Sequence, residues 1–283
     1  MKTGLVLEGG AMRGMYTAGV LDTFLDNGIE FDCIVGVSAG ALFGVNFLSR
    51  QKGRVIRYNK RFNADKNYMG IIPLIKEGNI FSTKYAYEDV PRRLDPFDDD
   101  TYKSCNVPFY AVLTDVDSGQ PEYVRIDSVF EQMDTLRASG SMPIVSKPVE
   151  IGGRLYLDGG ISDSIPYEWL LSQGCDKLVV VLTRHIDYRK KPASPAVVGL
   201  CGAKYPKIAE RMKSRHENYN RSAERLLELE REVKAFVIRP SEEIKIGRLE
   251  KDPRKLQAVY ELGVKDCMKC AGKLAEYICS VEC

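Results

Sequence analysis

A serine stands between two glycines in the segment Gly36-Val37-Ser38-Ala39-Gly40, which fits the pattern G-x-S-x-G. Serines that attack carbonyl carbons are often held this way, on a sharp turn between a strand and a helix. Side chains two residues before and after the serine would collide on such a turn, so both positions need glycine. The following helix would also direct amide groups and its positive dipole end at a developing oxyanion. We therefore interpret Ser38 as a candidate nucleophile.

The context of the pentapeptide supports this interpretation. The pattern alone is weak, because a chain of 283 residues with 24 glycines can match it by chance. The apolar run Phe31–Val37 predicts a buried strand, however, and Ala39–Leu48 predicts an apolar helix. The simpler alternative is a tight strand–helix turn whose serine only caps the helix.

A second glycine-rich turn follows the first predicted strand, Gly4–Glu8. Its distinctive residues are Gly9, Gly10, Ala11, Arg13 and Gly14. A dinucleotide-binding loop fits poorly, because Ala11 interrupts the G-x-G-x-x-G spacing and no acid ends the second strand. Consecutive strands are usually neighbours, so both turns should emerge at one edge of the sheet. We expect Gly9, Gly10 and Ala11 to supply an oxyanion hole, with Gly10 and Ala11 as its donor pair.

A third feature, Asp158-Gly159-Gly160, closes a predicted hairpin whose arms are Val149–Ile151 and Arg154–Leu157. The two glycines make the backbone permissive, so the carboxylate can approach another segment of the chain closely. A plain turn aspartate is the alternative, and it is the more common case for such a segment taken alone.

These three features together resemble the patatin-like phospholipase family, over roughly residues 3–185. The segments ASGSMPIVSKPV (138–149), DGGISDSIP (158–166) and TDVDSG (114–119) add to the resemblance. Glu8 departs from the family pattern, in which many members carry Gly or Asp, but the pair of glycines that follows it is intact.

The resemblance implies a Ser–Asp dyad without a catalytic histidine. Carried onto this chain, it makes Ser38 the nucleophile and Asp158 the base, and the motif-supporting residues are Arg13, Gly14, Gly36, Gly40, Gly159 and Gly160. The implied function is a serine esterase of the phospholipase A type, a carboxylic ester hydrolase that cleaves acyl esters of lipids through an acyl-serine. A carboxylate with an ordinary pKa of ~4 is ionised at pH 7 and can hold the serine hydroxyl directly.

Two other functions remain open at this point. An α/β-hydrolase triad would use the order Ser38, Asp158, His185, although the serine turn of that fold lies deeper in the chain. A non-catalytic lipid- or acyl-binding module on a patatin scaffold would not need the intact Ser38, Asp158 and glycine turns. The chain has only two histidines, and the dyad predicts that both His185 and His216 tolerate substitution.

The pattern of apolar residues predicts an α/β fold with three layers, α/β/α, around a mainly parallel sheet. We expect a patatin-like catalytic domain over residues 3–185. The remainder, 186–283, predicts a C-terminal helical extension with one strand, packed on the same domain. Its elements are a charged helix over 206–234, a strand over 236–240 and a helix over 253–280. Residues between 50 and 105 are mixed in character and give no clear assignment.

The charge balance argues against a nucleic-acid-binding protein. Lys and Arg number 41 and Asp and Glu 39, a net charge of +2. The N-terminal residues do not resemble a signal peptide, and the longest apolar stretch, Ile34–Leu48, falls short of the ~20 residues of a membrane span. We expect a cytoplasmic protein that binds a lipid or small acyl-ester substrate, soluble or peripheral to the inner membrane face.

A basic segment runs from Arg184 to Arg215, with nine Lys and Arg residues against two acids around the apolar stretch AVVGLCG (196–202). Such a segment could contact anionic lipid at a membrane surface. The alternative is a linker followed by one solvated helix face. Arg13 also has two interpretations: it could favour a phosphate headgroup or an oxyanion, or it could pair with a nearby acid.

The eight cysteines are expected to be thiols, and no metal or other cofactor is expected. The C-terminal sequence CMKCAGKLAEYICSVEC has spacings that zinc sites use. On a helix, however, Cys267 and Cys270 share a face from which Cys279 and Cys283 point away. The sequence also has no H-E-x-x-H motif and no P-loop.

Overall fold

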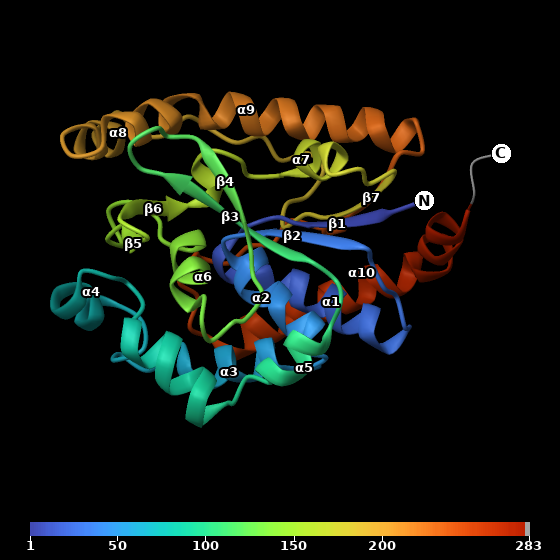
Figure 1. Cartoon of the computed structure of the whole chain (residues 1–283), viewed down its shortest axis with the longest axis horizontal. Coiled ribbons are helices and arrows are strands. Elements are labelled where there is room, and N and C mark those ends of the chain that lie inside the picture. The colour runs from blue at the N-terminus through green and yellow to red at the C-terminus, as the bar shows by residue number, and fades with distance from the viewer. Residues whose placement is uncertain (281–283) are drawn as a thin grey trace.

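The computed structural model describes residues 1–280 (Figure 1). Its strands are β1 (Thr3–Leu7), β2 (Cys33–Val37), β3 (Phe109–Asp115), β4 (Pro121–Arg125), β5 (Val149–Ile151), β6 (Arg154–Asp158), β7 (Lys177–Val181) and β8 (Ala235–Ile238). Its α-helices are α1 (Met15–Asp26), α2 (Ala39–Leu48), α3 (Arg54–Phe62), α4 (Ile71–Glu77), α5 (Asp99–Ser104), α6 (Met133–Ser139), α7 (Tyr167–Ser172), α8 (Pro195–Gly202), α9 (Pro206–Arg231) and α10 (Pro253–Cys279). Two short 3-10 helices, η1 (Ala11–Gly14) and η3 (Gly159–Ile161), and a π-helical segment, η2 (Tyr85–Leu94), complete the set.

The described strands form one sheet in the order β5-β6-β3-β2-β1-β7-β8, with β4 also paired to β3. The neighbours from β3 to β8 run parallel, and the pairs that involve β4, β5 and β6 run antiparallel. Helices cover both faces of this sheet (Figure 1). The predicted three-layer α/β/α fold with a mainly parallel centre is therefore confirmed.

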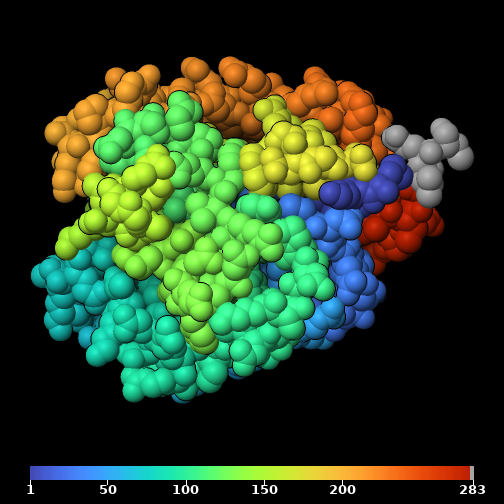
Figure 2. All heavy atoms as spheres, viewed as in Figure 1, coloured from blue at the N-terminus to red at the C-terminus, as the bar shows by residue number. Residues whose placement is uncertain are grey.

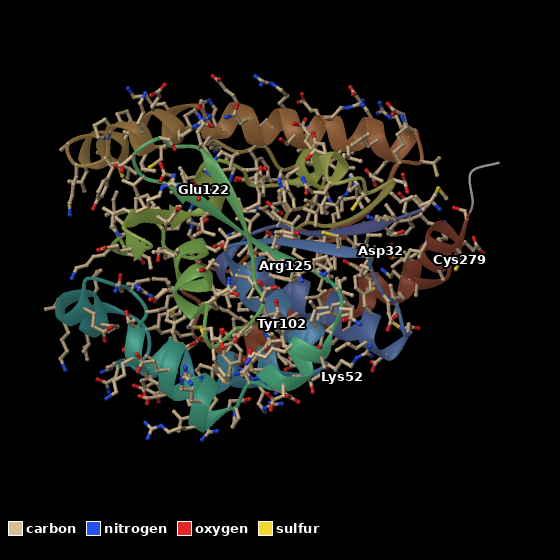
Figure 3. All side chains as sticks on the ribbon, viewed as in Figure 1. Asp32, Lys52, Tyr102, Glu122, Arg125 and Cys279 are labelled. Carbon is tan, nitrogen blue, oxygen red and sulfur yellow. The ribbon has the colours of Figure 1, made fainter. Side chains whose placement is uncertain are left out.

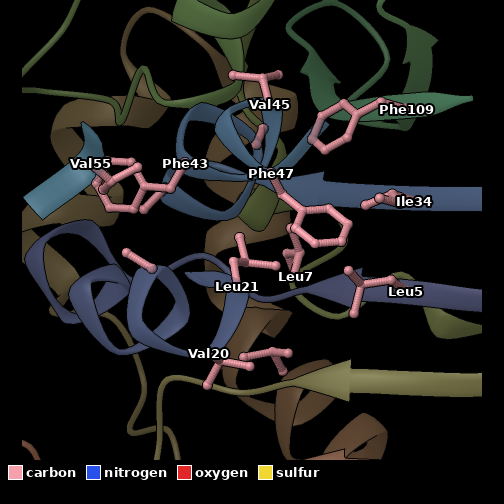
Figure 4. Packing of buried hydrophobic residues seen from close by; sticks show 14 of the residues in the cluster. Leu5, Leu7, Val20, Leu21, Ile34, Phe43, Val45, Phe47, Val55 and Phe109 are labelled. Atoms are coloured by element: carbon pink, nitrogen blue, oxygen red, sulfur yellow. The ribbon is translucent and has the colours of Figure 1, made fainter. Parts of the chain in front are cut away.

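Both faces of the central strands are buried, because successive side chains on a strand point in opposite directions. Leu5 and Leu7 join the core cluster formed with α1, α2 and α10, and Val6 joins the cluster formed with α7 and α9. Figure 4 shows the first of these clusters, in which Phe47 of α2 lies over the strands beside Ile34. This double burial explains why the strand sequences are almost continuously apolar.

The C-terminal extension covers both faces of the sheet. In Figure 1 and Figure 2, α9 lies along the top of the molecule, while α10 passes on the other side of the sheet from α9. Glycines allow α10 to cross α1 closely: a Cβ atom at Gly19 would lie 2.1 Å from the Tyr260 carbonyl oxygen, and one at Gly263 would lie 2.1 Å from that of Tyr16. The domain boundary at residue 185 remains a prediction.

The region between residues 50 and 105 folds into α3, α4, η2 and α5. Arg54 is buried beside Asp95, with 3.3 Å between Nε and Oδ1, and Arg57 pairs with the same carboxylate at 2.8 Å. These ion pairs tie α3 to the residue that ends η2. The segment contains Pro91 and a π-helix, which helical periodicity does not predict.

Lys52 and Arg125, which Figure 3 labels, are charged residues with exposed side chains. Of the described helices, none combines the length and the apolar character needed to cross a bilayer. Cys33 and Cys175 are buried thiols, and Cys105 is half-buried. Within residues 1–280 no group of His, Cys, Asp and Glu is arranged to hold a metal ion, and Cys283 lies outside the described residues.

Candidate active site

Ser38 lies on a strained turn between β2 and α2. Its backbone angles, φ 54° and ψ −120°, are unusual for a residue with a side chain. A Cβ atom at Gly40 would lie 2.3 Å from the Leu7 carbonyl oxygen, and one at Gly36 would lie 2.7 Å from the backbone of Ala41. A side chain at either glycine would therefore collide with neighbouring backbone.

The amide of Ser38 has an acceptor that the sequence did not reveal. It donates to Oγ of Ser139 over 3.0 Å, and the Ser139 hydroxyl donates to the Val112 carbonyl over 2.8 Å. Ser139 thus joins the turn to β3 and α6. The Ser38 amide is therefore not free to bind an oxyanion. The start of α2 has one amide fewer to offer to an oxyanion for that reason.

Asp158 ends β6 and is almost completely buried, with 2% of its surface exposed. Its amide donates to the Ser141 carbonyl over 2.9 Å, and its Oδ1 accepts from the Gly160 amide over 2.8 Å. The Ser38 hydroxyl faces the same carboxylate as a hydrogen-bond partner. Asp158 is therefore both the residue that begins the turn and the hydrogen-bond partner of Ser38, and the turn holds it in place.

Burial raises the pKa of Asp158, because an ionised carboxylate is disfavoured away from water. The positive charge of Arg215, and then the hydrogen bond from Ser38, act in the opposite direction on this pKa. Arg215 is fixed by a hydrogen bond from its Nε to the Gly160 carbonyl. A raised pKa makes Asp158 a stronger proton acceptor than an exposed aspartate.

The first glycine-rich turn lies directly against Ser38. A Cβ atom at Gly9 would lie 2.9 Å from the Cβ of Ser38, so only glycine fits there. Ala11 has a positive φ of 49°. Within residues 1–280 the amides of Gly10 and Ala11 donate no hydrogen bond, and both residues line the same cavity as Ser38 and Asp158. The structure thus brings together the three features that the sequence singled out.

Two further motif glycines permit close packing beside the site. A Cβ atom at Gly159 would lie 2.1 Å from the Val112 carbonyl oxygen, and one at Gly14 would lie 2.7 Å from the ring of Phe43. Both positions support the turns on which Ser38 and Asp158 lie.

Glu8, which precedes the first glycine-rich turn, joins that turn to the end of β7 and to α9 through hydrogen bonds. It is 4% exposed and accepts hydrogen bonds from the Thr183 amide at 2.6 Å and the Thr183 hydroxyl at 3.1 Å. Its other oxygen accepts from the Tyr219 hydroxyl at 2.8 Å. Glu8, the residue that departs from the family pattern, therefore connects β1, the end of β7 and α9.

Neither histidine forms a hydrogen bond with Ser38 or Asp158 in the described structure. Nδ1 of His185 lies 3.3 Å from Oδ2 of Asp187, at the rim of the cavity. Nδ1 of His216 lies 2.9 Å from the Lys213 carbonyl oxygen. The contacts of Asp158 thus differ from those that a Ser–Asp–His triad requires.

Two hollows of different character meet at Ser38. The larger, about 1120 Å³, is lined by Ser38, Asp158 and the first glycine-rich turn, and by many charged groups. The smaller, about 250 Å³, is lined mainly by apolar and aromatic side chains, including Leu42, Phe43, Tyr68 and Met133. We call them the polar cavity and the apolar pocket.

Six Lys and Arg residues line the polar cavity without forming an ion pair with any described residue. They are Arg13, Arg184, Lys190, Lys191, Arg215 and Arg248. None of them forms a salt bridge within the described residues, and Nε of Arg13 is buried without any hydrogen bond. Burial, followed by the charge of Arg184, lowers the pKa of Arg13 to about 10. The expected alternative of a paired Arg13 is not what the structure contains.

The basic segment 184–215 also differs from a simple solvated surface. Arg184, Lys190 and Arg215 reach the polar cavity, whereas Lys204, Lys207 and Lys213 are exposed. Arg248, which joins them from the loop before α10, had no distinguishing feature in the sequence. Only the three-dimensional arrangement brings these four residues beside Ser38.

The site thus consists of a serine on a strained strand–helix turn that faces a buried aspartate, and it lies on a three-layer α/β/α fold. The patatin-like phospholipase family matches residues 5–171, which is more than half of the chain. The chain therefore belongs to that family. Residues 205–278 separately match a domain of unknown function, DUF6363.

Several curated proteins are similar over the family region. The chain is 32% identical over 184 residues to "Uncharacterized protein YjjU" of Escherichia coli K12, a match that covers 63% of this chain and 51% of that protein. It is 24% identical to "Neuropathy target esterase sws" of Drosophila melanogaster, over 63% of this chain and 12% of that protein. The chain thus spans about half of the bacterial relative and a small part of the fly one. Among solved structures, VipD of Legionella pneumophila aligns over 96% of this chain and 67% of its own, at 13% identity and a TM-score of 0.48.

Proposed function

We propose that this protein is a serine lipid acyl hydrolase of the phospholipase A or esterase type. The observation that carries the proposal is the convergence of Ser38, Asp158 and two unoccupied backbone amides on one cavity. A nucleophile, a base and an oxyanion site are the three parts that acyl transfer requires. Membership of the patatin-like phospholipase family supports the same reaction.

In the first half of the proposed reaction, Oγ of Ser38 attacks the ester carbonyl carbon while Asp158 accepts the hydroxyl proton. The carbonyl oxygen becomes an oxyanion, which the amides of Gly10 and Ala11 stabilise. Collapse of this intermediate breaks the ester C–O bond, and the leaving alcohol takes the proton from Asp158. The product of this half-reaction is an acyl-serine.

In the second half, a water molecule replaces the alcohol. Asp158 accepts a proton from the water as its oxygen attacks the acyl carbon. The same two amides stabilise the second oxyanion, and the proton returns to Oγ of Ser38 as the fatty acid leaves. A carboxylate is a weaker base than imidazole, so the oxyanion site must provide much of the stabilisation, typically ~3 kcal/mol for one donor.

The site contacts favour this mechanism over the two alternatives. A triad would require His185 between Ser38 and Asp158, but its nearest acid is Asp187 at the rim. A binding module would not require a strained serine, and strain of this kind is commonly retained where a side chain must be displayed for reaction.

We also propose that the end of the molecule near α4 and α8 contacts lipid. Ile71 and Ile75 on α4 are 70% and 78% exposed, and Leu200 on α8 is 63% exposed. Figure 1 shows α4 and α8 at the same end of the molecule, on the left of the view. Exposed aliphatic side chains beside basic residues are typical of interfacial enzymes. Binding to sedimenting vesicles of anionic phospholipid should fall in Ile71→Ser/Ile75→Ser but not in Met268→Ser, which alters an exposed residue of α10. The expected cytoplasmic location stays a prediction.

The central test is labelling with a fluorophosphonate, which reacts with activated serines, followed by mass mapping of the modified peptide. Label should appear on Ser38, and Ser38→Ala should lose both label and hydrolysis of p-nitrophenyl butyrate. Ser146→Ala is the matched control, because Ser146 lines the neighbouring apolar pocket. Label at another serine, or full activity of Ser38→Ala, would contradict the proposal. Activity on this soluble ester should survive dialysis against EDTA.

A further inference from the structure

The polar cavity contains more positive charge than the reaction needs. The six basic residues named above, which we call the cation cluster, form no ion pair within residues 1–280. Two buried acids lie beside them: Glu8, which accepts hydrogen bonds from Thr183 and Tyr219, and Asp158, which accepts from Ser38 and Gly160. Their negative charges offset only part of the positive charge of the cluster. Like charges in a partly buried space repel one another, so the cluster costs stability unless an anion occupies it.

The cluster is held in place by contacts with rings and backbone instead of acids. The guanidinium carbon of Arg184 lies 4.0 Å from the centre of the Tyr188 ring, and Nζ of Lys190 lies 4.3 Å from that of Tyr219. These contacts position the cations while leaving most of their donor atoms available. Nε of Arg13 is buried and has no acceptor at all.

Most of the cluster lies outside the family region. The family match ends at residue 171, whereas Arg184, Lys190, Arg215 and Arg248 all follow it. Residues beyond the family match therefore supply most of the positive charge of the cavity. The reacting groups come from the family region alone. The cations that follow this region would therefore affect which substrate binds and not the reaction itself.

We propose that the cation cluster binds a phosphate monoester, so that the preferred substrate is an acyl ester whose alcohol carries a terminal phosphate. This inference rests on the proposed function. The ester carbonyl would lie at Ser38, the acyl chain in the apolar pocket, and the phosphate-bearing alcohol in the polar cavity. The cavity, at about 1120 Å³, has room for such a headgroup and water.

The charge of the cluster favours a monoester over the common zwitterionic headgroups. A phosphate monoester carries a charge between about −1.5 and −2 at pH 7 and offers three strong acceptor oxygens. A phosphocholine group has one negative charge and would also bring a quaternary ammonium among six basic side chains. Arginine is suited to phosphate because its planar donors can bind two oxygens together.

The test compares two non-hydrolysable lipids with the same chain, dodecyl phosphate and dodecylphosphocholine, as inhibitors of p-nitrophenyl butyrate hydrolysis below their micellar concentrations. We expect dodecyl phosphate to inhibit at a concentration at least about tenfold lower. Equal inhibition constants would overturn the proposal. Inorganic phosphate distinguishes the source of the anion: inhibition as strong as that by dodecyl phosphate would show a site for free phosphate instead of a lipid headgroup.

Variants then locate the selectivity in the cluster. Arg248→Gln and Arg184→Gln should each weaken inhibition by dodecyl phosphate on the order of tenfold while leaving that by dodecylphosphocholine nearly unchanged. Lys245→Gln is the matched control, since Lys245 is an exposed residue of the same loop as Arg248 and does not line the cavity. A preference that survives in Arg184→Gln/Arg248→Gln protein with an unchanged Tm would also overturn the proposal.

Calorimetry on Ser38→Ala protein separates this inference from the proposed function. The variant cannot turn over through Ser38, yet it should bind dodecyl phosphate with the same preference over dodecylphosphocholine. If Ser38→Ala still hydrolyses p-nitrophenyl butyrate, the proposed mechanism fails while the binding ratio still reports on the cluster. If hydrolysis is lost but the two lipids bind equally, only the headgroup assignment fails.

Discussion

The two hollows that meet at Ser38 differ in both chemistry and origin. The apolar pocket is built by α2, α3, η2 and α6, all within the family region, together with the loop before α10. The polar cavity takes its turns from the family region but most of its cations from residues beyond 171. One side of the serine is thus suited to hydrocarbon and the other to an anion.

This difference indicates how one scaffold can keep a reaction and change its substrate. The strained serine, the buried aspartate and the free amides are fixed by strands and turns at the centre of the sheet. The charge on the alcohol side depends on a segment that packs over that centre from the C-terminal extension. Substitutions in the extension should therefore alter selectivity, whereas substitutions at the turns should abolish the reaction.

The largest expected effect comes from Asp158→Asn, which removes the proposed base beside Ser38, the residue at which the two hollows meet. The amide can still hydrogen-bond to Ser38 but cannot accept its proton, so kcat should fall by several orders of magnitude. His185→Asn should retain nearly full activity, because that residue pairs with Asp187 at the rim. A folded but inactive His185→Asn protein would instead favour the triad.

Asp158→Asn should also make the protein more stable at pH 7. Burial raises the pKa of Asp158, so the contribution of this group to stability is present at low pH and is lost as the pH rises through the folded pKa. A neutral amide removes that cost, and Tm measured by calorimetry should rise. The raised pKa also moves the acid limb of activity on a neutral ester above the usual ~4. An acid limb that stays at or below ~4 would contradict Asp158 as the base.

The sequence was sufficient to predict the centre of this fold. Apolar runs predicted the positions of β1 and β2 within a few residues, because strands buried on both faces must be apolar throughout. The G-x-S-x-G turn was equally predictable, since its glycines are required by contacts with neighbouring backbone. The segment between residues 50 and 105 was not, because its helices are short, polar and fixed by ion pairs such as Arg54–Asp95.

Only those residues of the candidate site that lie on short turns at the ends of strands could be predicted from the sequence. Ser38 and the amides of Gly10 and Ala11 each follow a strand of the parallel centre, so topology brings them to one edge. Asp158 ends β6, which runs antiparallel to β3, so its place beside Ser38 followed from the family resemblance and not from topology. Arg248 and Ser139 follow no such rule: one comes from a long loop, and the other acts through a single hydroxyl contact with the Ser38 amide. No local pattern distinguishes such residues from ordinary polar positions.

A second prediction sharpens the assignment of the apolar pocket to the acyl chain. Met133 lines that pocket and is partly buried, so Met133→Trp should shorten the space available. Each methylene removed from water contributes ~0.8 kcal/mol, so losing two of them should lower kcat/KM about tenfold on a long-chain ester. Hydrolysis of p-nitrophenyl acetate should be unchanged. An equal loss on both esters would indicate damage to the site itself, and no loss on the long ester would exclude this pocket for the chain.

The smallest expected effect concerns the charge of Lys190 on the other side of the serine. Burial, and then the positive charge of Arg215, lowers the pKa of Lys190 to about 7. Arg184 and Arg13 act in the same direction, while Glu8 opposes them. Lys190 is therefore half-protonated near neutral pH, unlike an ordinary lysine.

Sulfate isolates this titration, because it keeps two negative charges throughout the pH range in which Lys190 changes. A bound dianion favours the ammonium form, so inhibition of p-nitrophenyl butyrate hydrolysis by sulfate should weaken severalfold as the pH rises from 6 to 8. In Lys190→Arg the guanidinium stays charged, and inhibition should be strong at both pH values. His185 and His216 also line the cavity and are retained in that variant. If Lys190→Arg shows the same weakening as the natural protein, Lys190 does not cause the pH dependence of anion binding.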